Sequence, residues 1–171
     1  MQLHNKTFHK FITAGQMSES VAAAGAEISE MYAGKNPICI VVMQGAFVFA
    51  ADILRRFNYS VEVEFIRIRS YTGMQSNAIT QEVILPDVVN RHVIIIEDII
   101  DSGNTLHFLM QQLQAKQPAS VFTLALLQKQ VQRILSADKV CFEIPDKFVV
   151  GYGLDYDQSG RNLPDIWQLS E

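Results

Sequence analysis

The sequence predicts an α/β fold with a mainly parallel sheet flanked by helices. Two short, continuous apolar runs, ICIVVM (38–43) and VIII (93–96), have the length and composition of strands that are buried on both faces. A helical pattern follows each run after a turn that contains glycine. A third apolar run, SVFTLALL (120–127), begins 27 residues after the second. Because a strand, a crossover helix and the next parallel strand take about 30 residues, this spacing indicates parallel strands.

The length and composition of the chain favour one domain and a small partner. With 171 residues, 49% of them hydrophobic, the chain can build one core but not two ordinary domains. The net charge of -4 and the lack of a Lys/Arg run argue against broad binding to nucleic acid or to an anionic membrane. Cys39 and Cys141 lie in apolar stretches, which is typical of free thiols in a reducing compartment. We find neither a signal-like N-terminus nor an apolar run near the roughly 18 residues of a membrane span, and expect a cytoplasmic protein.

The remaining elements follow in chain order. A first helix is predicted from Ser18 to Gly34, because apolar residues recur on one side of it: Val21, Ala24, Ile28, Met31 and Tyr32. VEVEFIRIR (61–69) alternates like a strand, but its apolar phase shifts between Phe65 and Ile66, which indicates a bulge or a strand that leaves the core. A helix after the second buried strand is predicted from the spacing of Leu106, Leu109, Met110 and Leu113.

An acidic stretch and a glycine-containing loop follow the second buried strand, in EDIIDSGNTL (97–106). Ligands of open parallel sheets bind beyond the carboxyl ends of the strands. Residues 102–105 combine hydroxyls, a glycine and successive backbone N–H groups at a helix start, which suits a phosphate. Acids beside a phosphate need sugar hydroxyls or a divalent metal between them, so we expect a sugar phosphate.

Neighbouring strand residues face opposite sides, so Glu97 and Asp98 can serve one ligand only if the chain is already turning out of the sheet. Taken singly, the acids also fit a solvated strand end, with Asp101 as a helix cap.

Three stretches resemble a known family. VIIIEDIIDSGNTL (93–106) resembles the phosphoribosyl-pyrophosphate motif of the purine phosphoribosyltransferases: two acids, two apolar residues, then an acid and a Gly/Thr loop. EIPDKFVVGYGLDY (143–156) resembles the purine-binding stretch of the hypoxanthine-guanine branch, and MQGAFVFAADI (43–53) resembles its pyrophosphate loop and following helix. Residues 1–15 match nothing. The resemblance implies a type I phosphoribosyltransferase fold in one domain, residues 1–171, with a small hood formed by the N-terminal and C-terminal segments.

The resemblance also implies an activity and a set of site residues. The activity is purine salvage: transfer of the phosphoribosyl group of phosphoribosyl pyrophosphate to hypoxanthine or guanine, which gives IMP or GMP and pyrophosphate. Asp101 would be the general base. The residues implied for phosphoribosyl pyrophosphate are Glu97, Asp98, Asp101, Ser102, Gly103, Asn104, Thr105, Gln44, Gly45 and Arg161. Those implied for the purine are Lys129, as donor to the 6-oxo group, Phe148, Val149 and Asp155. The cofactor would be Mg²⁺, held by Glu97, Asp98 and Asp155.

Three further expectations concern the surroundings of the site. Ser70 and Tyr71 match the start of a mobile loop that covers the site. The family usually has Lys or Arg where this chain has Gln44, which leaves pyrophosphate binding open, although Gly45 allows a close backbone approach. The helix after this loop carries more large apolar residues than one face can bury, among them Phe47, and the family implies a homodimer or homotetramer.

Alternatives remain open at this point. A xanthine-preferring or other nucleobase phosphoribosyltransferase fits the same motifs, because contacts to the purine 2-position decide that choice. A regulatory protein that only senses phosphoribosyl pyrophosphate usually carries an added DNA-binding segment, for which 171 residues leave no room. A Rossmann-like binding module without this chemistry requires Asp101 and Lys129 to lie far apart.

Overall fold

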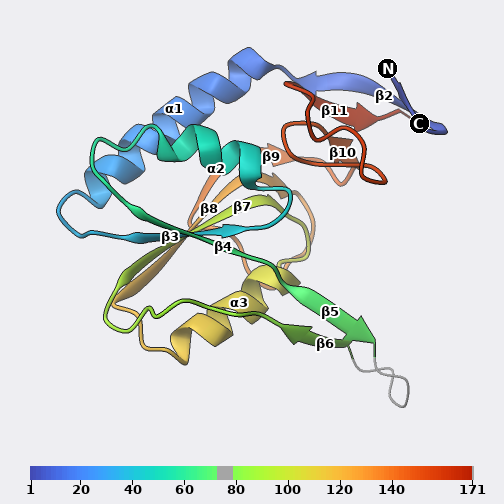
Figure 1. Ribbon diagram of the computed structural model, residues 1–171. Helices are drawn as coiled ribbons and strands as arrows, with labels where there is room; N and C mark the ends of the chain where they lie inside the picture. Colours follow the sequence, from blue (N-terminus) through green and yellow to red (C-terminus); the bar gives the residue numbers. More distant parts are fainter. Residues whose placement is uncertain (73–78, 171) are drawn as a thin grey trace.

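The central element of the fold is a five-stranded parallel sheet with the strand order β4-β3-β7-β8-β9 (Figure 1). The computed structural model describes residues 1–72 and 79–170, and of residues 69–72 and 79–82 it describes only the backbone. The strands of the sheet are β4 (Glu62–Ile66), β3 (Ile38–Val42), β7 (His92–Ile100), β8 (Ser120–Lys129) and β9 (Lys139–Ile144). All neighbouring pairs run parallel, which confirms the predicted sheet.

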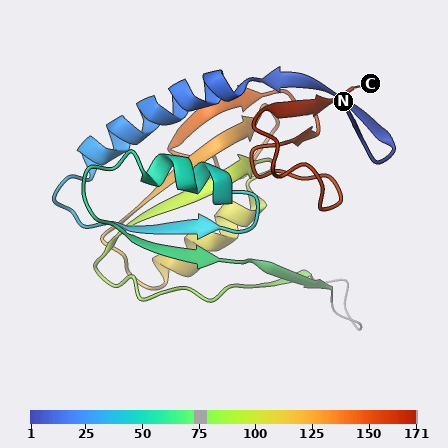
Figure 2. The same ribbon diagram turned by 45° about the horizontal axis from the view of Figure 1, so that its top comes forward.

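Helices cover both faces of the sheet (Figures 1 and 2). Helices α1 (Ala14–Met31) and α2 (Phe47–Leu54) lie on one face, and α3 (Asn104–Gln114) lies on the other. Alternate residues of a strand point to opposite faces, so Cys39 and Val41 join the core under α1 and α2, whereas Ile38 and Ile40 join the core under α3. This two-sided burial explains why the central strands are continuously apolar.

Helix α1 begins earlier than predicted. Its N-cap is Thr13, whose hydroxyl accepts a hydrogen bond from the backbone N–H of Gln16, while the Gln16 side chain accepts one from the backbone N–H of Thr13. This reciprocal cap needs Glu or Gln three residues after the cap, which Thr13 has and Ser18 does not. Met31, which the sequence placed on the apolar side of this helix, is its last residue, and its side chain is exposed.

Strand β4 ends where the sequence pattern shifts phase. Phe65 is exposed and Ile66 is buried against the core. The chain then leaves the sheet and forms a hairpin of β5 (Arg69–Thr72) and β6 (Ile79–Glu82), which projects from the body of the molecule (Figure 1). The prediction of a strand that leaves the core is therefore confirmed.

A second, antiparallel sheet joins the two ends of the chain. Its order is β1-β2-β11-β10, formed by β1 (Gln2–Leu3), β2 (Lys6–Ile12), β11 (Ile166–Leu169) and β10 (Val149–Val150). It lies on the side where the parallel strands end (Figure 1). Asp165, just before β11, accepts a hydrogen bond from the Ala14 backbone N–H at 2.9 Å and pairs with Lys10 at 2.7 Å, which ties this sheet to the start of α1.

Two further features of the fold concern its helices and its cysteines. Within residues 1–72 and 79–170, no helix is long and apolar enough to cross a membrane. Both cysteines are free, and burial raises the pKa of the Cys39 thiol to about 12, so this thiol behaves as a small apolar side chain.

Candidate active site

A polar cleft of about 410 Å³ opens where strands β3 and β7 end. Three segments that are far apart in the sequence line it: the loop after β3, the end of β7 with the start of α3, and the loop between β10 and β11. The cleft brings together seven of the predicted site residues: Gln44, Gly45, Glu97, Asp98, Thr105, Asp155 and Arg161.

Glu97 and Asp98 both border this cleft, although the chain does not turn out of the sheet at this point. Strand β7 continues to Ile100, so the condition set for two neighbouring acids to serve one ligand, a chain that already turns out of the sheet, is not met. The pairing of β7 with β8 includes Glu97 and Ile99 but not Asp98. Burial raises the pKa of Glu97 well above its usual value, and the nearby Asp98 raises it further. Burial also raises the pKa of Asp98 to about 6, against the lowering effect of the Ile99 N–H that its carboxylate accepts. Two adjacent carboxylates in this state favour a cation or hydroxyl donors as partners.

The loop after β3 approaches the acids through its backbone. A Cβ atom on Gly45 would lie 1.5 Å from Oδ2 of Asp98, and one on Gly153 would lie 2.1 Å from the carbonyl oxygen of Gly45. The peptide bond between Met43 and Gln44 is cis, and Gln44 is exposed at the edge of the cleft. A side chain at position 45 therefore requires either Asp98 or the loop to move.

A smaller hollow of about 80 Å³ lies beside the cleft, at the start of α3. Its lining includes Asp101 and the predicted loop residues 102–105, and it shares Glu97 and Thr105 with the cleft. Gly103 precedes α3 with a φ of 78°, and a Cβ there would lie 2.4 Å from the Leu135 carbonyl oxygen, so this position requires glycine. Free backbone N–H groups at a helix start, together with nearby hydroxyls, are of the kind that can bind an anion.

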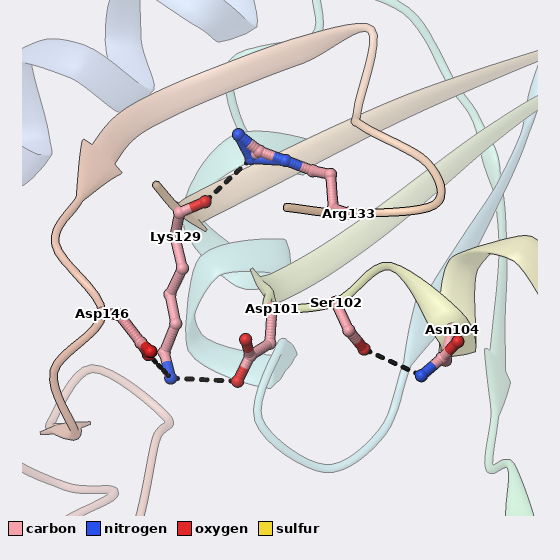
Figure 3. A network of polar contacts seen from close by, with 6 residues as sticks. All are labelled: Asp101, Ser102, Asn104, Lys129, Arg133 and Asp146. Carbon is pink, nitrogen blue, oxygen red and sulfur yellow. Dashed lines mark hydrogen bonds and ion pairs between the residues drawn. The ribbon is translucent and has the colours of Figure 1, made fainter. Parts of the chain in front are cut away.

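Asp101 and Lys129 are in direct contact. The Lys129 ammonium donates hydrogen bonds of 2.9 Å to Asp101 and of 2.9 Å to Asp146 (Figure 3). The Lys129 side chain is only 14% exposed. Burial lowers the pKa of Lys129, but the hydrogen bonds and charges of Asp146 and Asp101 together raise it above its usual value. The condition that favoured a plain binding module, a large separation of Asp101 and Lys129, is not met.

An aromatic cluster includes Phe148, which follows Asp146, the partner of Lys129, by two residues. Phe148 is 44% exposed, although it contacts Phe8 of β2 and Tyr156 at ring-centroid distances of 6.4 and 5.8 Å. Val149 pairs with Gln168 on β11, and the Leu169 N–H bonds to the Phe148 carbonyl. Because paired residues alternate in an antiparallel ladder, the backbone N–H and C=O of Val149 point away from β11, toward the open edge of the sheet. An exposed ring and an outward-facing backbone suit a flat, polar-edged ligand.

Arg161 and Asp155 pair across the loop between β10 and β11. Nη2 of Arg161 lies 2.7 Å from Oδ1 of Asp155, and Nη1 donates to the Gly153 carbonyl oxygen at 2.9 Å. The second oxygen of Asp155 accepts the Gln158 backbone N–H at 2.8 Å. Both oxygens of Asp155 therefore already have partners in this structure.

Comparison with known proteins gives this arrangement a family. The model of the phosphoribosyl transferase domain matches residues 12–157. The chain belongs to the phosphoribosyltransferase family. It is 37% identical to the hypoxanthine-guanine phosphoribosyltransferase of Streptococcus pneumoniae, over 99% of this chain and 97% of that protein. It is 41% identical to the hypoxanthine phosphoribosyltransferase of Haemophilus influenzae, over 92% of this chain and 93% of that protein.

Solved structures agree with this assignment. The hypoxanthine phosphoribosyltransferase of Staphylococcus aureus superimposes with a TM-score of 0.88 at 32% identity, over 98% of this chain and 94% of that one. The fold is thus the expected type I phosphoribosyltransferase fold, with its parallel sheet and a small antiparallel hood sheet.

This phosphoribosyltransferase contains site residues that the sequence did not identify. Arg67 lines the cleft, Asp146 binds Lys129, and Phe8 supports the ring of Phe148. In the sequence, Arg67 is one of several charged residues that alternate along VEVEFIRIR (61–69). Asp146 is one of several acids in the stretch that resembles the purine-binding segment (143–156). Phe8 lies in the N-terminal segment that matched nothing. Only the contacts across the fold distinguish these residues from their neighbours.

The mobile loop that the sequence predicts over the site lies largely outside the described part of the chain. The backbones of Ser70 and Tyr71 belong to β5, which pairs with β6. Their side chains, and residues 73–78, lie outside the described residues. The expectation of a mobile loop that starts at Ser70 stays a prediction.

The buried charge of Glu97 predicts a pH-dependent gain in stability for the Glu97→Gln variant. Glu97 is 7% exposed, and its Oε2 atom has no hydrogen-bond partner among the described residues. Because the pKa of Glu97 is raised in the folded state, wild-type stability falls as pH rises above the unfolded-state value of about 4.3, whereas glutamine has no such loss. We expect the variant to gain on the order of 1 kcal/mol in free energy of unfolding at pH 8 in EDTA, with a smaller gain at pH 5. Urea unfolding at both pH values measures this; an equal difference at both would contradict it.

Proposed function

We propose that this chain transfers the phosphoribosyl group of phosphoribosyl pyrophosphate to hypoxanthine or guanine, giving IMP or GMP and pyrophosphate in purine salvage. The contact between Lys129 and Asp101 carries the proposal. It places a donor suited to a 6-oxo group beside a carboxylate suited to the imidazole ring, at the edge of a phosphate-binding loop. Adenine, which has an amino group at position 6, has no acceptor there for the lysine.

The sugar pyrophosphate would occupy the cleft and the adjacent hollow, whose linings share Glu97 and Thr105. Its 5-phosphate would bind at the start of α3, to the backbone and hydroxyls of residues 102–105. Its 2- and 3-hydroxyls would donate to Glu97 and Asp98. Burial raises the pKa of both carboxyl groups, and hydrogen bonds from the ribose would stabilise their charged forms. The pyrophosphate would extend toward the Gly45 backbone, Arg161 and Arg67, which line the cleft. In this arrangement the backbone and the two arginines compensate for the neutral Gln44.

The proton transfer would take place in the part of the site that binds the purine. One imidazole nitrogen of the purine forms a bond to the anomeric carbon while the bond from that carbon to the pyrophosphate oxygen breaks. Asp101 accepts or holds the proton of the other imidazole nitrogen, which keeps the attacking ring electron-rich. Lys129 donates to the 6-oxo group, Phe148 stacks on the ring, and the Val149 backbone meets the edge of the base. Catalysis then rests on positioning and electrostatics rather than on a covalent intermediate.

The acidic pair fits Mg²⁺ as the cofactor. Oε2 of Glu97 is buried, with no partner in the part of the chain that the structure describes, and Asp98 borders the same cleft. Among the described residues no group of three or more acidic, His or Cys side chains could hold a metal ion by itself. Mg²⁺ is usually bound by one or two carboxylates together with substrate oxygens and water, so two acids suffice. Bound there, the metal supplies charge neutralisation for the pyrophosphate. The metal and purine roles of Asp155 stay predictions, because Arg161 and Gln158 hold its oxygens.

We also infer how the chain is organised and assembled. Residues 1–171 would form one domain, in which the antiparallel sheet acts as the hood over the base. The free thiols support a reducing compartment such as the cytoplasm. Phe49 and Ile53 of α2 are buried in the core, whereas Phe47 is exposed and Val48 is half-buried. A homodimer or homotetramer would cover this apolar surface; sedimentation as a monomer at micromolar concentration would contradict it.

A panel of five bases tests the function. Hypoxanthine, guanine, xanthine, adenine and uracil are each mixed with the protein, phosphoribosyl pyrophosphate and Mg²⁺, and nucleotide formation is measured. We expect rapid formation of IMP or GMP, and a rate with adenine that is lower by a factor of roughly 10 to 100 or more, because an unpaired buried donor costs about 1 to 3 kcal/mol. XMP as the fastest product would favour the xanthine-preferring alternative. Nucleotide from none of the bases would contradict the proposal.

A further inference from the structure

Lys129 is held at its tip by two carboxylates from different parts of the fold. Asp101 follows β7, and Asp146 lies between β9 and β10 (Figure 3). Both hydrogen bonds are 2.9 Å long, and the lysine is largely buried while both acids are more than half exposed. An ammonium group has three N–H donors, so two are engaged and one remains for a ligand.

The backbone of Lys129 is held separately from behind. Nη1 of Arg133 donates to the Lys129 carbonyl oxygen at 2.8 Å, and Nη2 of Arg133 lies 3.8 Å from Glu143. Gln128, the residue before Lys129, donates to Glu143 at 2.6 Å. These contacts fix the end of β8 without Asp101 or Asp146. What the two acids add is therefore the direction and the charge of the ammonium group.

The two acids have different roles during the proposed reaction. Asp101 has to turn toward the purine and hold its imidazole proton, and a carboxyl group that holds a proton is a much weaker partner for a cation. Asp146 does not take part in this proton transfer. It can keep its hydrogen bond to Lys129 while the bond between Lys129 and Asp101 weakens.

We propose that Asp146 is a positioning residue for the transfer: it keeps the Lys129 ammonium aimed at the purine 6-oxo group while Asp101 is released to serve the imidazole ring. This inference rests on the proposed function. The role is specific to the base, because Asp146 borders neither the cleft nor the hollow where phosphoribosyl pyrophosphate would bind.

Electrostatics around the lysine supports this role. Burial lowers the pKa of Lys129, and Asp146 and Asp101 reverse that effect through hydrogen bonds and charge. Within the described part of the chain, charged groups that contact Lys129 include Asp101 after β7, Asp146 after β9, and Arg133, which binds the Lys129 carbonyl oxygen. Without Asp146, one of the two carboxylates that raise the pKa of Lys129 is lost. The lysine then loses its proton at a lower pH, most readily when Asp101 is engaged with the purine.

The test compares Asp146→Asn with the wild type and with two further variants. Asparagine has the same size but no charge. Asp146→Glu restores the charge on a longer side chain. Asp87→Asn is a matched control for the loss of one carboxylate, because Asp87 is exposed, lies in the segment before β7, and uses an oxygen that asparagine keeps to accept the Val89 N–H. Steady-state rates are measured against hypoxanthine and against phosphoribosyl pyrophosphate from pH 6 to 10.

For Asp146→Asn we expect the Michaelis constant for hypoxanthine to rise about tenfold, and that for phosphoribosyl pyrophosphate to stay within about twofold. The alkaline limb of kcat/KM for hypoxanthine should move to lower pH. Asp146→Glu should recover part of both effects, and Asp87→Asn should behave as wild type.

Two results would overturn the inference while leaving the function intact. One is an Asp146→Asn variant with an unchanged hypoxanthine constant and an unchanged alkaline limb. The other is an equal loss toward both substrates together with a lower melting temperature, which indicates a general structural role. A wild-type protein that forms no IMP contradicts the proposed function itself, so the two failures are distinguishable.

Discussion

Asp101→Asn is expected to lower the turnover number for IMP formation by a factor on the order of 100 or more, the scale of general acid–base help. Asparagine cannot accept the imidazole proton, whereas it keeps an oxygen that can accept the hydrogen bond from Lys129. The phosphate-binding loop should remain intact, because its form depends on Gly103 and on the start of α3 rather than on the Asp101 charge.

The same variant should fold normally. Asp101 has a side chain that is 59% exposed, and exposed ion pairs contribute roughly 0 to 1 kcal/mol to stability. Saturating both substrates isolates the turnover number, and calorimetric titration with phosphoribosyl pyrophosphate and Mg²⁺ checks that the sugar site survives. Near-normal turnover in a protein that still binds the sugar would exclude Asp101 as the base.

Local sequence patterns predicted the central layer of the fold well. Residues 38–43 and 93–96 are apolar on both faces because helices cover both sides of β3 and β7, and a pattern of this kind is independent of distant contacts. The start of α1 was wrong because Ser18 and Thr13 are both good cap residues, and only the glutamine three residues after Thr13 separates them. The hood sheet has no local signal of this strength. Its strand β10 has only two residues, and its paired strands β2 and β11 come from opposite ends of the chain.

The candidate site was predictable where its residues share one stretch of sequence. Residues 97–105 suggest a sugar phosphate from their chemistry alone, and the family resemblance added Lys129 and Phe148. The contact between Lys129 and Asp146 joins residues that are 17 apart, with β9 between them. Arg67 reaches the cleft only because β4 runs beside β3. Such residues become functional candidates through tertiary contacts that no sequence period reports.

Gly45→Ala is expected to reduce kcat/KM for phosphoribosyl pyrophosphate by a factor on the order of 100 or more. A methyl group at position 45 would lie 1.5 Å from Oδ2 and 2.5 Å from Cγ of Asp98, so either the carboxylate or the loop has to move. Rotation of Asp98 would break its hydrogen bond with the Ile99 N–H, and it would withdraw an expected partner of the ribose hydroxyls from the cleft. Displacement of the loop would instead move the backbone that is expected to meet pyrophosphate. Misplacement of a positioning group by about 1 Å can cost about 100-fold in rate.

Gly15→Ala is the matched control for this substitution. Gly15 is exposed in the first turn of α1, and the nearest atom to a Cβ there is the Thr13 hydroxyl oxygen at 3.9 Å. Alanine should fit at that position and leave the rate unchanged.

For Gly45→Ala we expect only a modest loss of stability, because Asp98 has a short side chain at the edge of a cleft and can rotate. The substitution should therefore separate affinity for the sugar from folding. Melting temperatures and steady-state rates of both variants measure the two effects, and a Gly45→Ala enzyme with wild-type kcat/KM would show that Asp98 is not needed where the structure places it.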